Sequence, residues 1–457
     1  MPRFDLEKCH LGGLELWLRY WYRRGPRFAY YQQQLKKTSR LAPPELERFQ
    51  NRKLQALITQ SYQHIPYYRD LMDQLKLKPH DIQTKQDLRK LPFLTKKLVT
   101  DNYDKLIHPH KRNFLSKVAC TSGTTGSPGK FMRSFDSINF EHAAVWRQWQ
   151  FAGDTGKRRI TLRGEVVVPM AQSEPPYWRY NPANQELLMC GFHLNEKTGR
   201  AYIEKILKFQ PEILSSYPSN AYRLAHLFKK HRINYRFQAV FTSSEELSPR
   251  MKDYIEAVFQ TQVYDWYGQS ERVAAIAHCQ AGRYHIQEDY SLVELVPHEQ
   301  QFEIVGTHLF NDLMPLIRYR TGDMVSPALK PCRCGSSFRC VESISGRSCA
   351  YILTPEGYKI SAANHIFHGV EHLLEAQLYQ DHPEVLTIYY VPDTDFTNDD
   401  RQKLLTNAIA NTSPRFQVIL KEVSHIARGA NGKFQSIVNL LAQHEPLSEM
   451  PDVLSAV

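Results

Sequence analysis

Short apolar runs alternate with helix-like segments from about residue 115 to residue 270, and this alternation limits the fold more than any other feature. Strands that alternate with helices usually form a parallel sheet with helices packed on its faces. The sequence therefore predicts an α/β fold in layers. The expected strands are Ile160–Val168, Ile213–Tyr217, Ala239–Thr242 and Val263–Tyr267, and the expected helices are Ala201–Phe209, Pro218–His231 and Pro249–Phe259.

The remaining parts of the 457-residue chain suggest one large domain followed by a small one. Residues 1–100 are mainly helical in pattern, with a long helix after Pro43-Pro44, and 101–346 would complete the large domain. Two antiparallel strands are expected at 292–296 and 301–306. A β/α pattern then recurs at 385–391, 399–412 and 416–420, which indicates an α+β domain over residues 347–445 and a tail over 446–457.

The net charge of +11 implies a basic surface and an anionic partner. The chain contains no arginine-rich tract and no nucleic-acid motif, so we do not expect nucleic acid as the partner. The segment 14–31 mixes tryptophan and tyrosine with arginine. It is either an interfacial helix in peripheral contact with a membrane or a docked surface helix with a basic outer face.

Eight cysteines are too few for a disulfide framework in a chain of this length. The first residues lack the layout of a signal peptide, and no apolar run is long enough to span a membrane. We therefore expect the chain in a reducing cytoplasm.

The segment Thr121–Lys130 combines three glycines and five hydroxyl side chains with a final lysine. Glycines allow backbone N–H groups to turn inward, and hydroxyls add donors, so such a loop can surround phosphate oxygens. Its spacing differs from the Walker pattern, and a plain surface linker remains the alternative.

Three further segments carry groups that could bind a nucleotide. Tyr267–Glu271 follows an expected strand, where a glutamate could hold Mg²⁺ at the rim of the sheet. Arg318–Asp323 places an aspartate after a turn glycine, where it could accept ribose hydroxyls while the arginines contact phosphate. Arg428–Phe434 carries Lys433 on a glycine-flanked loop, where its charge could meet a developing oxyanion. Each segment alone is no better than a solvated turn.

Taken together, in this order and spacing, these segments resemble the motifs of the adenylate-forming acid ligases. The most similar branch is that of phenylacetate–CoA ligases and CapK-type proteins encoded with capsule or exopolysaccharide genes. The resemblance runs from about Pro66 to about Asn439. It implies a large layered α/β adenylation domain and a small, mobile C-terminal α+β domain.

The resemblance also implies a two-step reaction in which a carboxylic acid attacks ATP-Mg²⁺ to give an acyl-adenylate and pyrophosphate, and an acceptor then displaces AMP. In that scheme Lys433 acts only in the first step, Glu271 holds Mg²⁺, Asp323 binds the ribose and Thr124 takes part in catalysis at the phosphates. The other nucleotide-binding residues would be Ser122, Gly123, Thr125, Gly126, Ser244, Glu245, Tyr267, Gly268 and Arg347.

Two departures from the family pattern concern the acceptor. Acidic residues usually follow the glycine-arginine pair, but Ser348 and Cys349 stand there, and the glycine-containing strand that lines the CoA tunnel is replaced by 357–364. Adenylation would be unaffected. The acceptor is either CoA or an amine or hydroxyl of a sugar.

A second constellation consists of Cys279, His285, Cys332 and Cys334. Three sulfur ligands and one nitrogen ligand are enough for a closed tetrahedral zinc site, and the set is similar to the Cys/His sets of some members of the branch. Cys340 could replace one of them, and unpaired buried thiols are the alternative.

The contrasting hypothesis is a non-catalytic, nucleotide-binding and membrane-associated assembly protein. It leaves Lys433 without a role. By the resemblance, segments 146–149, 164–165 and 217–222 would line the acid pocket, but the acid itself cannot be named. A homodimer is the commonest assembly for a soluble protein.

Overall fold

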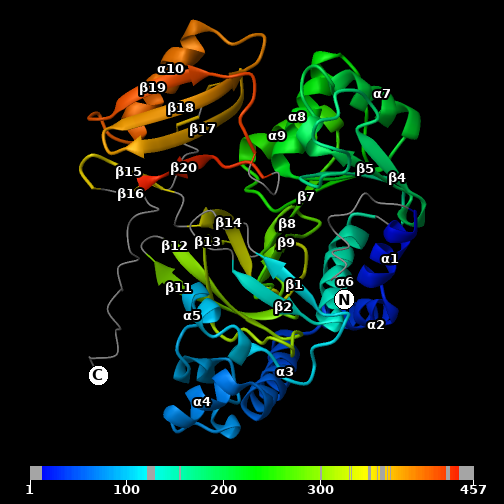
Figure 1. The fold of residues 1–457 in the computed structure, drawn as a ribbon, viewed down its shortest axis with the longest axis vertical. Helices are drawn as coiled ribbons and strands as arrows, with labels where there is room; N and C mark the ends of the chain where they lie inside the picture. Colours follow the sequence, from blue (N-terminus) through cyan, green and yellow to red (C-terminus); the bar gives the residue numbers. More distant parts are fainter. Residues whose placement is uncertain are drawn as a thin grey trace. The chain divides into compact units, whose positions relative to one another are not determined.

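The computed structural model describes residues 13–120, 129–153, 156–298, 301–328, 330, 332–347, 351–357, 359–360, 366–367, 369–370, 372–428 and 433–441. These residues divide into two compact units (Figure 1). The large unit contains the described residues up to Gly346 together with Lys433, and the small unit contains the described residues between Arg347 and Leu441 other than Lys433.

Helices form the start of the large unit, as the sequence predicts. Proline stands at the first turn of α2, α3 and α4, where its missing N–H costs nothing. In α3 the Glu45 carboxylate accepts a hydrogen bond from the Ala42 N–H, 3.1 Å away, and caps the helix. The helices are α1 (Gly13–Arg23), α2 (Pro26–Thr38), α3 (Pro43–His64), α4 (Pro66–Gln74) and α5 (Lys96–Asp101).

One large sheet runs through the large unit, and its described strands follow the order β11-β12-β13-β14-β10-β9-β8-β7-β6-β3-β5-β4. Strands β8, β7, β6, β3 and β5 are parallel to their neighbours in this order. They are β3 (Arg159–Arg163), β5 (Glu186–Cys190), β6 (Ile213–Ser216), β7 (Ala239–Ser243) and β8 (Val263–Gly268), with the antiparallel β4 (Trp178–Asn181) at the edge.

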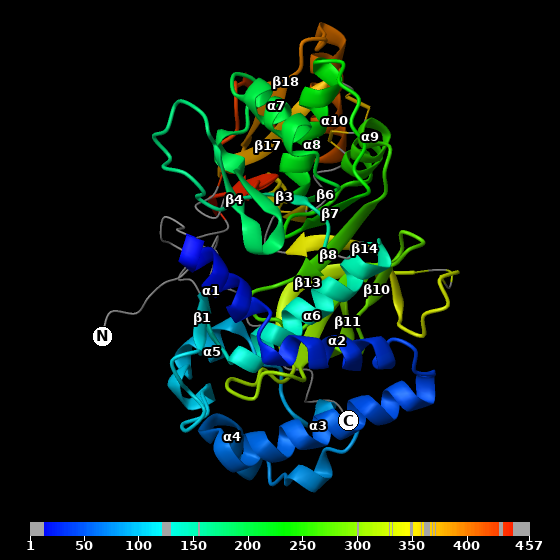
Figure 2. The same ribbon diagram turned by 90° about the vertical axis from the view of Figure 1, so that its right-hand side faces the viewer.

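Helices cover both faces of this parallel part. One face carries Leu162, Leu214 and Val240 and packs against α7 (Gly199–Phe209), α8 (Pro218–Lys230) and α9 (Pro249–Phe259). Phe241 lies on the other face and stacks on Trp149 of α6 (Phe135–Phe151), with 5.3 Å between ring centroids. Figure 2 shows α6 and α2 side by side. The predicted α/β layering is confirmed.

The predicted strand over 160–168 is too long, because β3 ends at Arg163. Val166–Val168 have high β propensity, but Gly164 and Pro169 flank them, and burial of Val167 and Val168 against the apolar core needs no sheet pairing.

The other half of the sheet is antiparallel. Its strands are β9 (Ala275–His278), β10 (Tyr284–Ile286), β11 (Ser291–His298), β12 (Gln301–His308), β13 (Tyr319–Pro327) and β14 (Cys340–Arg347). A separate hairpin pairs β1 (Lys117–Cys120) with β2 (Lys130–Arg133).

A buried ion pair joins the N-terminal helices to the sheet. Arg147 of α6 contacts Asp289, with 2.5 Å between Nη1 and Oδ2 and side-chain exposures of 6% and 0%. The same guanidinium donates to the Leu35 carbonyl of α2. Removing one partner of such a pair leaves a buried charge, so this contact fixes α2, α6 and the β10–β11 connection relative to one another.

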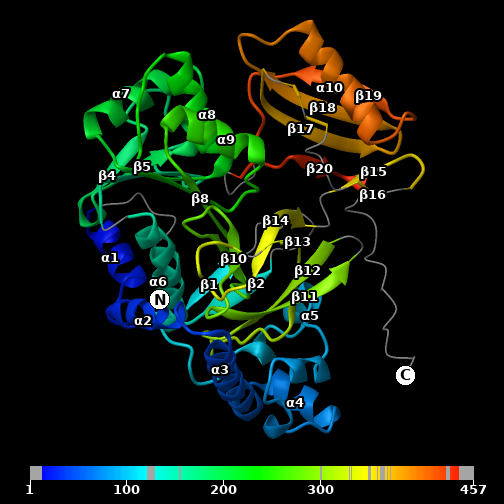
Figure 3. The ribbon, with the colours of Figure 1, turned by 180° about the vertical axis from the view of Figure 1, so that it is seen from behind.

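The small unit contains a sheet of described order β19-β18-β17-β20, with α10 packed on it (Figure 3). Its core includes Leu378, Ile388 and Leu404. The elements are β15 (Ile352–Leu353), β16 (Lys359–Ile360), β17 (Leu373–His382), β18 (Val385–Pro392), α10 (Asn398–Asn411), β19 (Gln417–Glu422) and β20 (Ile437–Asn439). The predicted tail, 446–457, lies outside the described residues.

Within the described part of the chain, no helix combines the length and the apolar character that a membrane span needs.

Candidate active site

The β1–β2 hairpin closes the ends of the loop that is rich in glycine and hydroxyl residues. Cys120 of β1 lies opposite Lys130 of β2, so the strand pairing brings together the two residues that flank the 121–129 segment. The loop residues Ser122, Gly123, Thr124, Thr125 and Gly126 lie outside the described residues.

Two hydrogen bonds hold this hairpin against the turn that follows β8. The Ser270 hydroxyl donates to the Cys120 carbonyl over 3.3 Å, and Arg133 Nη2 donates to the Ser270 carbonyl over 2.5 Å. The start of the glycine-rich loop therefore lies beside Ser270, one residue before Glu271. Sequence reasoning missed Arg133 and Ser270, because nothing in a local pattern reports a contact across 137 residues.

The Tyr267–Glu271 segment and the Arg318–Asp323 segment are joined twice. The Tyr267 hydroxyl donates to Asp323 Oδ2 over 2.7 Å, and the Tyr319 hydroxyl donates to Glu271 Oε1 over 2.9 Å. Burial and the Asp323 carboxylate raise the pKa of Tyr267 well above its usual value, so this hydroxyl keeps its proton and remains a donor. The structure thus brings both predicted carboxylates to one edge of the sheet.

Glu271 is only 7% exposed, and its Oε2 is buried with no hydrogen-bond partner among the described residues. A buried carboxylate oxygen without a partner is costly unless a cation or a donor reaches it. This donor suits Mg²⁺, which takes one or two carboxylates and leaves its other positions to water and phosphate.

Asp323 follows Gly322, whose φ of +73° places it in the left-handed region that favours glycine. Asp323 is 8% exposed, and its own N–H donates to Thr321 Oγ1 over 3.0 Å. The turn therefore fixes the direction in which the carboxylate leaves β13.

Arg318 and Arg320, the predicted phosphate partners, both pair with carboxylates of the protein. Arg318 pairs with Glu294 at 2.8 Å, and its guanidinium lies 4.2 Å from the centroid of the Phe93 ring. Arg320 pairs with Glu303, whose carboxylate also accepts from the Gly322 N–H. Glu294 and Glu303 lie on β11 and β12, and only the sheet pairing brings them to these arginines.

Ser244 and Glu245 follow β7 at the carboxyl edge of the parallel strands. Ser244 is exposed with φ +75°, and Glu245 Oε2 accepts a hydrogen bond from the Ser219 N–H over 3.1 Å. Gly268 at the end of β8 is exposed. Binding pockets in open α/β sheets usually lie at this edge.

Lys433 belongs to the large unit, whereas Arg428 and Phe434, on either side of it in the chain, belong to the small unit. Arg428 pairs with Glu375 at 2.6 Å, with side-chain exposures of 8% and 6%, and its guanidinium lies 4.7 Å from the centroid of the Phe434 ring. These contacts hold both ends of the 428–434 loop. Gly432 lies outside the described residues, as do Ser348, Cys349 and 361–364, while Arg347 is the last residue of β14.

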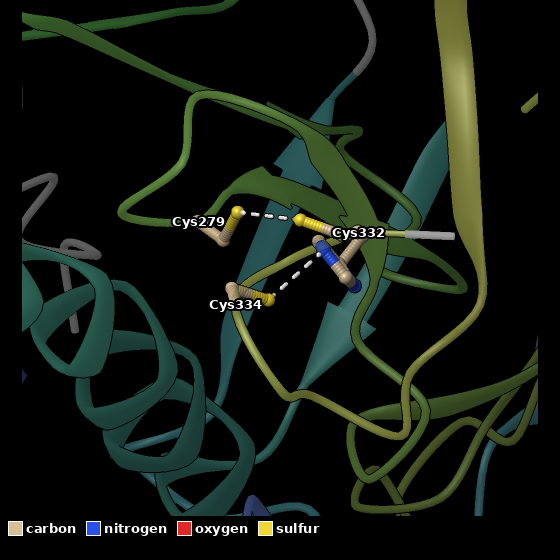
Figure 4. A group of neighbouring side chains, drawn as sticks. Cys279, Cys332 and Cys334 are labelled. Carbon is tan, nitrogen blue, oxygen red and sulfur yellow. Dashed lines mark hydrogen bonds between the residues drawn. The ribbon is translucent and has the colours of Figure 1, made fainter. Parts of the chain in front are cut away.

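The predicted metal ligands come together in the large unit (Figure 4). The ligand atoms of Cys279, His285, Cys332 and Cys334 all lie within 4.8 Å of one another. Cys279 follows β9 and His285 lies on β10, so the β9–β10 turn brings these two close together. Cys332 and Cys334 approach from the connection between β13 and β14.

Two of the separations are close to those of a tetrahedral zinc centre. Zinc bonds of about 2.3 Å to sulfur and about 2.0 Å to nitrogen place sulfur pairs about 3.8 Å apart and sulfur–nitrogen pairs about 3.5 Å apart. The Cys279 and Cys332 sulfurs are 3.6 Å apart, and Cys334 Sγ is 3.4 Å from His285 Nε2. His285 Nδ1 lies 2.9 Å from the Phe338 carbonyl, which fixes this nitrogen as the donor and leaves Nε2 to a metal.

Asp265 lies on β8, two residues before Tyr267, and the pKa of its carboxyl group is raised. Its carboxylate accepts hydrogen bonds from Thr242 Oγ1 at 2.6 Å and from the Tyr284 hydroxyl at 2.8 Å. Burial outweighs these bonds and raises the pKa of Asp265 to about 6. It anchors β8 two residues before Tyr267.

Comparisons with known proteins relate the chain to one group of enzymes. A family model described as the CapK C-terminal domain matches residues 352–440. Protein CapK of Staphylococcus aureus is 28% identical over 288 residues, which is 62% of this chain and 63% of the relative. The alignment thus spans less than two thirds of CapK. The phenylacetate–coenzyme A ligase of Thermus thermophilus is 25% identical over 336 residues, which is 66% of this chain and 71% of the relative.

The fold agrees with these relatives. The crystal structure of 2-hydroxyisobutyryl-CoA ligase in the postadenylation state with 2-HIB-AMP superposes with a TM-score of 0.68. It is 17% identical and covers 88% of this chain and 91% of that chain. The same ligase with R3-HIB-AMP gives a TM-score of 0.67. The resemblance to adenylate-forming ligases is confirmed, as is the expected fold class.

Proposed function

On the premise that the chain is related to CapK and to the phenylacetate–coenzyme A ligases, we propose that it is an ATP-dependent, carboxylate-activating ligase. It joins a carboxylic acid to AMP, releases pyrophosphate and then transfers the acyl group to an acceptor. The observation that carries this proposal is the pair of hydrogen bonds from Tyr267 to Asp323 and from Tyr319 to Glu271, beside the start of the glycine-rich loop.

In the first step a carboxylate oxygen of the acid attacks the α-phosphorus of ATP, and the bond to the β-phosphate oxygen breaks. Glu271 would hold Mg²⁺, which neutralises phosphate charge when bound. Asp323 would accept both ribose hydroxyls, while Ser122–Gly126 would surround the phosphates and Thr124 would take part in catalysis there. Ser244, Glu245, Tyr267, Gly268 and Arg347 would complete the nucleotide site.

Lys433 would neutralise charge shared by the carboxylate and the α-phosphate. A lysine is a compact point charge that can serve this purpose without directional constraint. The ion pair of Arg428 with Glu375 and its contact with the Phe434 ring hold the residues on either side of the Lys433 segment. A protein that only binds a nucleotide would not need Lys433 to neutralise charge during a reaction. The non-catalytic hypothesis therefore leaves Lys433 without a role.

The acceptor is either CoA or a sugar hydroxyl or amine. CoA is supported by the phenylacetate–coenzyme A ligase relative. A sugar hydroxyl or amine, and with it a place in capsule polysaccharide biosynthesis, follows from the resemblance to CapK-type proteins encoded with capsule genes. The departures at Ser348, Cys349 and 357–364 concern acyl transfer and leave the first step unchanged.

We also propose a structural zinc ion held by Cys279, His285, Cys332 and Cys334. Three sulfurs and one imidazole nitrogen are the donors that zinc prefers, and their separations fit its bond lengths. The ion would tie the β9–β10 turn to the β13–β14 connection.

Three further proposals concern surroundings rather than chemistry. Trp17 and Trp21 on α1 are 54% and 38% exposed one helical turn apart, which supports peripheral contact with a membrane surface.

The six free cysteines among the described residues suit a reducing compartment such as the cytoplasm. A homodimer is the expected assembly, and light scattering would test it.

The test is pyrophosphate release from ATP-Mg²⁺ across a panel of aryl, fatty and hydroxy acids, with and without CoA. Release with a particular acid that is lost in Lys433→Ala would support the proposal. A further rise with CoA would identify the acceptor, while indifference to CoA would favour a sugar or amine. ATP binding without release across the panel would contradict the proposal.

A further inference from the structure

Arg163 is the last residue of β3, at the carboxyl edge of the parallel strands. In the sheet Thr161 lies beside Ser215, and Ser215 lies beside Phe241, which stacks on Trp149 of α6. Since residues two apart on a strand share a face, Arg163 lies on the face covered by α6. Its Nη2 donates to the Ser215 hydroxyl over 3.2 Å.

The charge of Arg163 lacks a carboxylate partner in the part of the chain that the structure describes. Its Nε is buried there without a hydrogen-bond partner. Two buried arginines of the large unit, Arg147 and Arg318, are matched by the acids Asp289 and Glu294. A third, Arg159, has its guanidinium over the rings of Trp146 and Trp149. A buried guanidinium nitrogen without an acceptor is costly, and an anionic ligand that reaches it would remove that cost.

Other donors surround the same position. The Tyr217 hydroxyl accepts a hydrogen bond from the Gly164 N–H, and the charges of Arg163, Glu165 and Glu245 all act on it. Ser219, at the start of α8, is 4% exposed, and its hydroxyl has no partner among the described residues. The Ser219 N–H already binds Glu245, so among the described residues here the Arg163 Nε still lacks an acceptor and its guanidinium still lacks a carboxylate partner.

The position suits the far end of a small acid. Strands β3, β6, β7 and β8 are consecutive in the sheet, and neighbouring strands are about 4.8 Å apart. The end of β3 is therefore on the order of 14 Å from the end of β8, where the nucleotide-binding segment begins. A long arginine side chain and a small acid can span that distance together.

We propose that Arg163 determines substrate specificity by binding a second carboxylate, so that this chain activates a dicarboxylic acid. The inference rests on the proposed function and narrows its substrate class. One carboxylate of the acid would react with ATP, and the other would pair with the Arg163 guanidinium beside the Ser215 hydroxyl.

The test compares pyrophosphate release with matched acids, namely adipate against hexanoate and 4-(carboxymethyl)benzoate against phenylacetate. The wild-type chain should favour each dicarboxylate by about tenfold or more in kcat/KM, the usual effect of a charge-assisted hydrogen bond. Arg163→Gln should remove that preference and change kcat/KM for the monocarboxylates by less than about threefold. Arg163→Lys should retain part of it.

Arg236→Gln is the matched control, because Arg236 is an exposed arginine of the same unit. It should leave the preference unchanged. Equal release with both members of each pair, or a preference that survives in a folded Arg163→Gln chain, would overturn the inference while the proposed function stands. Absence of release with every acid, with ATP still bound, would overturn both.

Discussion

At the scale of single residues, the site depends on tyrosines that position carboxylates. Tyr319 is buried, and its hydroxyl donates to Oε1 of Glu271, while Oε2 has no hydrogen-bond partner among the described residues. The motif around Tyr319 is visible in the sequence, but its bond to Glu271 is not, because the two residues are 48 positions apart. The family pattern identifies both residues without telling what joins them.

Tyr319→Phe should weaken Mg²⁺ binding, because Phe keeps the volume of the ring but leaves Glu271 Oε1 without its donor. We expect the Mg²⁺ concentration that gives half-maximal pyrophosphate release to rise about tenfold, in keeping with one hydrogen bond to a charged group. Tyr290→Phe removes a similar buried bond to Glu141 and should leave the Mg²⁺ dependence unchanged. An equal effect of both variants would argue against the role of Tyr319.

Asp265 provides a prediction about pH. Burial raises its pKa from 3.8 to about 6, so the folded chain binds this proton more tightly than the unfolded chain. The free energy of unfolding should therefore fall as pH rises from about 4 to about 6, by at most about 3 kcal/mol from this group.

Urea unfolding of the wild type and of Asp265→Asn between pH 4 and 7.5 would measure this contribution. The free energy of unfolding of the wild type, relative to that of the variant, should decline from about pH 4 to about pH 6 and stay constant from there to pH 7.5. A flat difference, or one that grows with pH, would show that Asp265 is not protonated in the folded chain.

At the scale of elements, local patterns predicted the elements well where burial follows a simple period. Strands β6, β7 and β8 are short, largely buried runs, and the structure has them within two residues of the expected bounds. β3 was predicted too long because propensity alone does not tell a buried loop from a strand. The order and pairing of strands β9 to β14 depend on contacts between residues far apart in the sequence. Because Arg318 and Arg320 pair with acids on neighbouring strands of this part, their ion pairs could not be predicted.

The Cys/His cluster is an element-scale feature that the sequence did predict, since its two halves lie at turns between adjoining strands. Cys332→Ser should lower the zinc content of the purified chain from one per chain to near zero. It should also lower Tm by at least about 3 °C, because the ion would cross-link two turns of the sheet. Metal analysis and thermal unfolding would measure both.

Cys120→Ser is the control, since Cys120 is also a free thiol but lies on the β1–β2 hairpin. It should keep the zinc content of the wild type. Metal-free wild-type chain with an unchanged Tm would contradict a structural zinc site.

At the scale of the whole molecule, the predicted site residues Glu271, Asp323 and Lys433 all belong to the large unit. Arg428 and Phe434, on either side of Lys433 in the chain, belong to the small unit. The phenylacetate–coenzyme A ligase relative supports the proposed reaction class, and the solved structures agree in fold. Which acid and which acceptor are used depends on side chains at the strand ends and cannot be inferred from motifs.

The most direct test of the central claim is acid-dependent exchange of labelled pyrophosphate into ATP, without CoA. The wild-type chain should catalyse exchange only when its acid is present. Glu271→Gln should reduce the exchange by about 100-fold or more, as expected for loss of a group that stabilises transferring phosphate. Glu204→Gln, an exposed glutamate of α7, should exchange at the wild-type rate. Exchange that is independent of acid or unaffected by Glu271→Gln would contradict the account.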